Sequence, residues 1–226
     1  MSGDVALIRA VSEHVTRWVG PITLVYHEIV SEKVHIDVHY VASTQDRPFE
    51  VLVTSGMSER PMSTPAGLDV PRFAEVVAIL PAGWPLVGAA LDDERNYWPV
   101  RMIKGLARYP HENEAWLGHG HSLSEGDGPS APFAPNTRLN AVILLPPVSL
   151  PRRFSTLRGT DRGEINFWAA VPLYWEELDL KLREGTDALL DAFARHGITD
   201  RIDPHRPNTA ICDASQHAGR SIRLVN

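Results

Sequence analysis

The sequence predicts an α+β fold in which helices pack on a mixed, largely antiparallel sheet. Segments patterned like strands outnumber those patterned like helices. The first strands follow one another along the chain without crossover helices between them. The expected helices lie at the two ends and in the middle of the chain, which differs from the regular alternation of a doubly wound α/β fold.

The first expected element is an amphipathic helix over residues 4–19. Apolar residues recur every three or four positions from Val5 to Trp18, which is the spacing of one helix face. Gly20 and Pro21 then follow, and this pair cannot continue a helix.

Four strands are expected next, over residues 22–30, 34–41, 50–55 and 74–80. The second alternates apolar and polar residues, which is typical of a strand with one buried and one exposed face. A stretch rich in glycine, proline and serine over residues 56–71 is expected to form a long surface loop.

The middle of the chain predicts a mostly buried helix with Pro99 in its first turn and Pro110 at its end. Its apolar stripe consists of Trp98, Met102, Leu106 and Tyr109. Residues 112–137 are rich in glycine and proline and are expected to form a long loop.

Two buried strands and two short helices complete the expected fold. The strands cover residues 139–145 and 164–171, and a basic connector over residues 151–163 joins them. The helices cover residues 175–183 and 187–196, the second capped by Thr186 and ended by Gly197.

One domain over residues 1–208 is the simplest organisation, because no linker separates two self-sufficient apolar sets. Its core covers residues 22–208, the helix over residues 4–19 precedes that core, and residues 209–226 form a C-terminal tail.

Composition narrows the classes of function. The 226 residues carry 22 basic and 28 acidic side chains, a net charge of −6, without a block of lysine or arginine. This disfavours a nucleic-acid partner, because binding to phosphates depends on basic contacts. The single cysteine, Cys212, cannot form an internal disulfide. Neither a signal peptide nor a membrane-spanning apolar run is present, so the expected location is the cytoplasm.

A chemically suggestive pattern is His35-Ile-Asp37-Val-His39, since alternate residues of a strand share one face. With His121 added, this set has the residue types of a catalytic zinc or iron site, so a metal-dependent hydrolase is one alternative. The other interpretation is structural, with Asp37 accepting hydrogen bonds from neighbouring histidines or backbone. No nucleotide-binding glycine motif or nucleophile elbow occurs, and no cofactor is expected.

Many ordered sequence blocks between residues 22 and 208 match one known family. They are His35–Tyr40, Arg47-Pro48, Leu52–Ser58, Pro61-Met62, Trp98-Pro99, Leu106–Glu112, Trp116–Gly118, Gly120-His121, Pro132–Pro135, Thr137–Leu139, Leu144–Pro147, Ile165–Phe167, Val171–Leu173, Glu176-Glu177 and Ile202–Pro204. In these blocks the chain resembles the suppressor of fused domain family, in its compact bacterial form without the second, C-terminal domain that helps grip Gli proteins.

The resemblance implies a non-enzymatic module that binds another protein, and no catalytic residues are carried over. In its most specific form it implies an immunity protein that neutralises a partner toxin. The first contact surface to consider is the loop with Met57, Ser58, Glu59, Arg60 and Met62. In this loop two flexible methionines lie on either side of an oppositely charged Glu-Arg pair. A scaffold role in a larger assembly is a further alternative, and the oligomeric state stays open.

Overall fold

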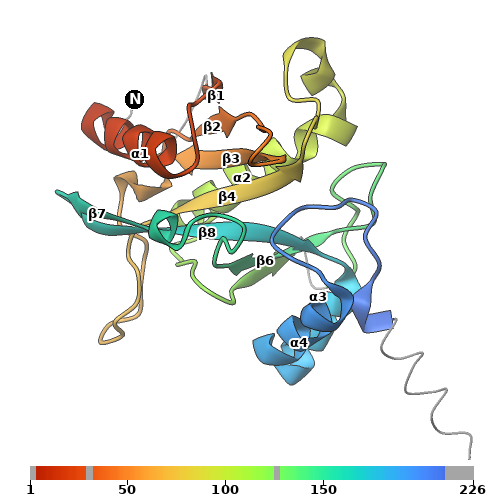
Figure 1. Cartoon of the computed structure of the whole chain (residues 1–226). Coiled ribbons are helices and arrows are strands. Elements are labelled where there is room, and N and C mark those ends of the chain that lie inside the picture. Colours follow the sequence, from red (N-terminus) through yellow and green to blue (C-terminus); the bar gives the residue numbers. More distant parts are fainter. Residues whose placement is uncertain (1–3, 29–32, 125–127, 212–226) are drawn as a thin grey trace, which may run out of the picture.

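The computed structural model describes residues 4–28, 33–124 and 128–211 (Figure 1). Four α-helices are present in this part of the chain: α1 (Val5–Trp18), α2 (Glu94–Glu112), α3 (Trp175–Glu184) and α4 (Thr186–His196). Its strands are β1 (Leu24–Tyr26), β2 (Asp37–Val41), β3 (Phe49–Ser55), β4 (Ala74–Pro81), β5 (Ser122–Ser124), β6 (Ala141–Leu145), β7 (Thr156–Thr160) and β8 (Gly163–Leu173). Three 3₁₀ turns complete it: η1 (Met57–Glu59), η2 (Gly88–Asp92) and η3 (Arg152–Ser155).

The eight strands of the described residues form one sheet in the order β1-β2-β3-β4-β8-β6-β5, and β7 pairs with β8 outside this path. The pairing of β4 with β8 is parallel and the other pairings are antiparallel. The expected α+β class with a mixed, largely antiparallel sheet is therefore confirmed.

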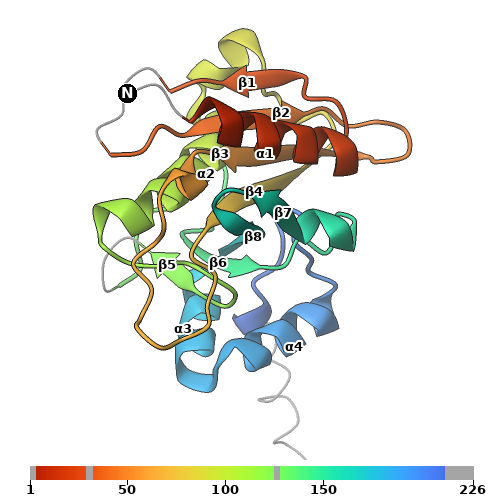
Figure 2. The same ribbon diagram turned by 90° about the vertical axis from the view of Figure 1, so that its left-hand side faces the viewer.

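Helices cover both faces of the sheet (Figure 2). The α2 face is packed by alternate strand residues such as Leu52, Val76 and Leu144. On the opposite face, α1 covers one end of the sheet and α3 with α4 covers the other. The residues between those of the α2 face, such as Val51 and Val77, pack toward α1.

This two-sided cover corrects the prediction for the second strand. A strand over residues 34–41 with an exposed polar face was expected, but β2 begins at Asp37 and all of its residues are buried. Asp37 and His39 are buried because the sheet has no solvent face at this strand. The first expected strand is likewise shorter, since β1 covers only Leu24–Tyr26.

The middle helix also differs from expectation, because α2 begins before Pro99 and continues past Pro110 to Glu112. A proline inside a helix lacks the N–H that would bond to the carbonyl four residues earlier. For Pro99 that carbonyl belongs to Arg95, and the side-chain amide of Asn136 donates to it over 3.2 Å. A contact from the loop over residues 112–137 thus replaces the missing bond.

Three local predictions need smaller corrections. The expected loop over residues 56–71 contains η1, and the basic connector over residues 151–163 contains η3, β7 and the turn that leads into β8. Thr186 is the first residue of α4 rather than its cap, which is Gly185. Gly197 ends α4 in the left-handed conformation, as predicted. No helix in the described ranges is long and apolar enough to cross a membrane.

Candidate interaction groove

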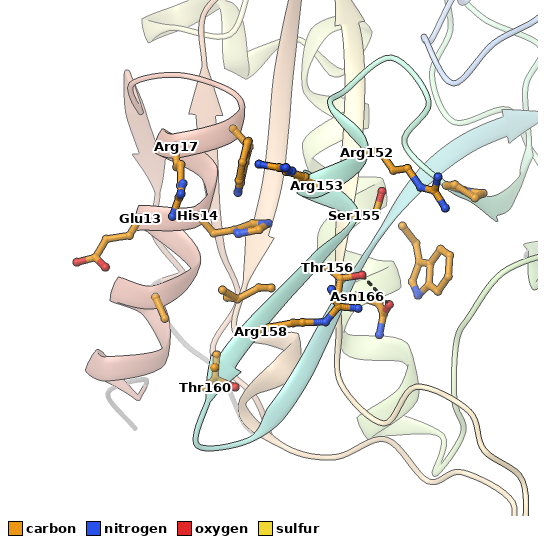
Figure 3. Close-up of a pocket in the computed structure, with 16 residues that line it drawn as sticks. Glu13, His14, Arg17, Arg152, Arg153, Ser155, Thr156, Arg158, Thr160 and Asn166 are labelled. Carbon is orange, nitrogen blue, oxygen red and sulfur yellow. Dashed lines mark hydrogen bonds between the residues drawn. The ribbon is translucent and has the colours of Figure 1, made fainter.

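A groove of about 1220 Å³ lies between α1, η3, β7 and β8 (Figure 3). Segments more than a hundred residues apart in the sequence build it. Helix α1 forms one wall, and η3 with β7 forms the other. Asn166 and Trp168 of β8 lie beside the second wall.

The first wall is fixed by the amphipathic pattern of α1. Asp4 caps the helix by accepting hydrogen bonds from the backbone N–H groups of Ala6 and Leu7. Val11 and Val15 are fully buried against the sheet, so the outer positions of the same helix reach solvent. Glu13 and Arg17 are exposed there and line the groove.

His14 joins the two walls. Its ring stacks against Phe154 and Phe167, with centroid distances of 5.4 and 5.1 Å. Its Nε2 lies 2.9 Å from the carbonyl oxygen of Phe154, so this nitrogen carries the proton and donates. Burial lowers the pKa of His14 below 6.5. The neutral imidazole therefore connects α1 to η3.

The second wall carries two adjacent arginines on η3. Phe154 is fully buried and anchors this turn, while Arg152 and Arg153 are exposed. The guanidinium carbon of Arg153 lies 5.7 Å from the centroid of Trp18, and that of Arg17 lies 5.0 Å from it. Both arginines therefore lie within cation–π range of one ring.

The groove is positively charged although the whole chain is acidic. Arg17, Arg152 and Arg153 form no ion pair with any carboxylate of the described residues. The other two charged residues that line the groove are neutralised. Arg158 pairs with Glu164 at 2.5 Å, and Glu13 pairs with Arg9 at 2.8 Å. Three exposed guanidinium groups thus remain for an anionic ligand.

The β7–β8 hairpin adds polar and backbone groups. Thr156 Oγ1 lies 3.5 Å from Asn166 Oδ1. Trp168 Nε1 is buried without a hydrogen-bond partner. Strand β7 pairs only with β8 within the described residues, so its second edge is unpaired. A register shift between Leu157 and Thr160 makes this edge irregular at its far end.

The chemistry of the groove lies in its charged and aromatic groups. His14 donates its Nε2 proton to the Phe154 carbonyl, and within the described residues no hydrogen bond joins its ring to Ser155 or Thr156. Exposed guanidinium groups beside apolar ring surface favour anion recognition.

The structure brings together only part of the predicted metal site. His27 Nδ1 and His35 Nε2 each lie 3.0 Å from an oxygen of Asp37, whose Oδ1 also accepts the Glu28 N–H. His121 precedes β5, at the opposite end of the strand order from β2, and its Nδ1 lies 3.1 Å from the Trp116 carbonyl oxygen.

No group of three or more His, Cys, Asp or Glu side chains in the described ranges is placed to hold a metal ion. The structure therefore does not bring His35, Asp37, His39 and His121 together as one set of ligands, and Asp37 accepts hydrogen bonds from its neighbours, as the structural interpretation expects. His39 is buried as well, and burial lowers its pKa from 6.5 to about 4.

The predicted contact loop is only partly at the surface. Met57, Ser58 and Met62 are buried, so in this structure they are not available to a partner. Glu75 holds the turn from inside by accepting the N–H of Gly56 at 3.0 Å and the N–H and hydroxyl of Ser58 at 3.0 and 2.5 Å. Glu59 is half-buried and Arg60 exposed, and their contact with a partner stays a prediction.

Few features of the sequence indicate the groove itself. The connector over residues 151–163 is basic, and this is the signal that points to Arg152 and Arg153. Arg17 lies on an ordinary amphipathic helix, and only the tertiary packing through His14 brings it to the same place.

Comparisons with known proteins agree with the fold. The sequence model of a family described as suppressor of fused protein (SUFU) matches residues 32–207. A search of curated proteins found no match. Among solved structures, a suppressor of fused homologue from Neisseria gonorrhoeae is similar at a TM-score of 0.64 and 14% identity, covering 91% of this chain and 98% of that one.

Two further structures are similar to a comparable degree. The crystal structure of a Sufu–Fu complex matches with a TM-score of 0.62 and 13% identity, covering 98% of this chain and 97% of that one. Drosophila Suppressor of Fused matches with a TM-score of 0.62 and 12% identity, covering 95% of this chain. The match takes in 52% of the Drosophila chain, so this protein spans about half of that structure.

Proposed function

The chain belongs to the suppressor of fused family, and from this premise we propose that it is a non-enzymatic module that binds another protein. The groove of Figure 3 is the observation that carries the proposal. It combines unpaired arginines, indole surface and an open strand edge, which are groups that recognise protein segments. A similar solved structure is that of a complex of Sufu with Fu.

In its most specific form, the proposal is that the partner is a toxin whose active surface becomes covered on binding. The net charge of −6 supports this form. Toxins that act on nucleic acids need basic surfaces, and an acidic protein attracts such a partner over a long range.

Affinity capture with the immobilised full-length chain tests the binding role. We expect one protein to be retained in a stoichiometric amount and to form a complex of defined mass when the two purified proteins are mixed. Failure to retain any protein above background across growth conditions contradicts the binding role.

The toxin role has its own test once the partner is purified. If the partner is a toxin, its activity should fall as this protein is added and vanish near one equivalent. A retained partner whose activity is unchanged at saturation leaves the binding role standing and refutes neutralisation.

A further inference from the structure

We infer that the groove between α1, η3 and β7 binds an extended acidic segment of the partner protein. This inference rests on the proposed function and adds the chemistry of the ligand and the residues that recognise it. The main recognition residues are Arg17, Arg152 and Arg153.

The three arginines supply the attraction. A guanidinium group can hold a carboxylate through two parallel hydrogen bonds, and such charge-assisted bonds are stronger than neutral ones. None of the three has a carboxylate partner within the described part of the chain. Binding an acidic segment therefore breaks no existing ion pair at these residues.

Two of the three arginines, Arg17 and Arg153, are also partly ordered before binding. Trp18 lies within cation–π range of both Arg17 and Arg153. His14 and Phe154 hold α1 against η3, which fixes the distance between the two walls. Side chains held in place lose less conformational entropy when they bind a ligand.

The groove favours a peptide over a nucleic acid. The unpaired edge of β7 next to η3 can exchange backbone hydrogen bonds with an extended peptide, which a nucleic acid cannot do in the same pattern. Because the register of β7 shifts after Leu157, such pairing is confined to the end beside Arg152 and Arg153.

The lining also defines which acidic segment fits. Trp18, Leu157 and Trp168 are half-buried and line the same groove as the arginines. We therefore expect apolar side chains to alternate with glutamate or aspartate in the ligand. The apolar side chains would then contact the indole rings, and the carboxylates would contact the guanidinium groups.

Fluorescence anisotropy with short labelled probes tests the inference on the full-length chain. The probes are a peptide of alternating glutamate and leucine, the same peptide with glutamine for glutamate, and a single-stranded oligo-thymidine. Two double variants with equal charge changes are compared. Arg152→Glu/Arg153→Glu alters the groove, and Arg72→Glu/Arg138→Glu alters exposed arginines elsewhere.

We expect the wild type and the control variant to bind the glutamate peptide at least about tenfold more tightly than the groove variant, a difference of about 1.4 kcal/mol. The wild type should bind the glutamine peptide and the oligo-thymidine more weakly than the glutamate peptide. Arg17→Ala, an exposed substitution on α1, should weaken binding in the same direction. Circular dichroism of each variant checks that the fold is retained.

Equal binding by the groove and control variants overturns the inference, and so does tighter binding of oligo-thymidine than of the glutamate peptide. The captured partner separates this result from the proposed function. If the partner binds the groove variant with unchanged affinity, the module still binds protein, but through another surface.

Discussion

Arg206 and Glu177 are buried charged side chains that are each held by several partners. Arg206 and Glu177 form an ion pair that is almost entirely shielded from water. Arg206 also donates to the Pro172 carbonyl at 2.9 Å, and Glu177 accepts the N–H and hydroxyl of Thr209 at 3.0 and 2.8 Å. The pair thus connects the segment after α4 to the start of α3.

Removing one member of this pair should be costly. We expect Arg206→Met to lower the free energy of unfolding by about 3–5 kcal/mol, because Glu177 then stays buried without its counter-charge. Urea denaturation measures the change. Arg183→Met is the control, since the Arg183–Asp179 pair is exposed and contributes at most about 1 kcal/mol. A loss as small as that of the control contradicts the assigned role of Arg206.

Buried histidines make stability depend on pH. The pKa values of His14, His39 and His111 are all lowered, chiefly by burial. Below pH 6.5 the unfolded chain therefore binds more protons than the folded one, so the folded state loses stability as the pH falls. The loss is complete only below the folded pKa, which for His39 is about 4.

His39 should account for much of this dependence. A lowering of its pKa from 6.5 to about 4 corresponds to about 3 kcal/mol lost between those pH values. Between neutral and acid pH, the free energy of unfolding should therefore fall by about 3 kcal/mol less in His39→Leu than in the wild type. Urea denaturation at the two pH values measures this difference. The exposed His205→Gln should keep the wild-type dependence. Identical pH profiles for His39→Leu and the wild type would falsify the role given to His39.

At the scale of elements, sequence patterns located α1 and α4 well because their end signals are local. The cap at Asp4 and the left-handed Gly197 depend on neighbouring residues alone. The burial of β2 could not be predicted in the same way. Alternation indicates a half-exposed strand, and only the packing of helices on both faces decides that Asp37 and His39 are inside.

Sequence patterns do not predict strand β7 or the groove, for a related reason. The segment Thr156–Thr160 is exposed or half-buried, contains Gly159 in a positive-φ conformation and lacks an apolar alternation. It is a strand because β8 supplies its partner. The arginines of the groove lie on α1 and η3, and no sequence spacing links those two elements.

The turn that follows β3 should tolerate no side chain at Gly56. Gly56 has φ +128°, and a Cβ there would lie 1.9 Å from the carbonyl oxygen of His35. We expect Gly56→Ala to lower the free energy of unfolding by at least about 2 kcal/mol. Gly105→Ala in α2 is the matched control, because its Cβ meets nothing within 4 Å and alanine favours helix. It should raise stability by about 0.5–1 kcal/mol. Similar losses in both variants would contradict this account of the turn.

At the scale of the whole molecule, one sheet supplies side chains to all three apolar clusters. Adjacent residues of β3, such as Val51 and Leu52, belong to the clusters under α1 and α2. In β6, Val142 packs toward α2 while Ile143 packs toward α3 and α4. Disruption of one cluster therefore reaches the others through the shared strands.

This sharing predicts that the chain unfolds as a single domain. Leu189 of α4 is fully buried in the cluster beneath α3 and α4. We expect Leu189→Ala to lower the free energy of unfolding by about 2–5 kcal/mol and to shift the whole transition. Far-ultraviolet circular dichroism and tryptophan fluorescence should report the same midpoint. A separate early transition in the variant, with the rest of the curve unmoved, would indicate two domains.

The cover on both faces of the sheet also determines how its backbone meets solvent. Every residue of β3 is buried, and the strand is paired on both sides, with β2 and β4. An amide proton at its centre can exchange with deuterium only when the sheet itself opens. The outer strands β1 and β5 each pair with one neighbour, so their amides can exchange through local fraying. In heavy water, β3 should therefore keep its protons longest, and its exchange rate should follow the stability of the entire chain.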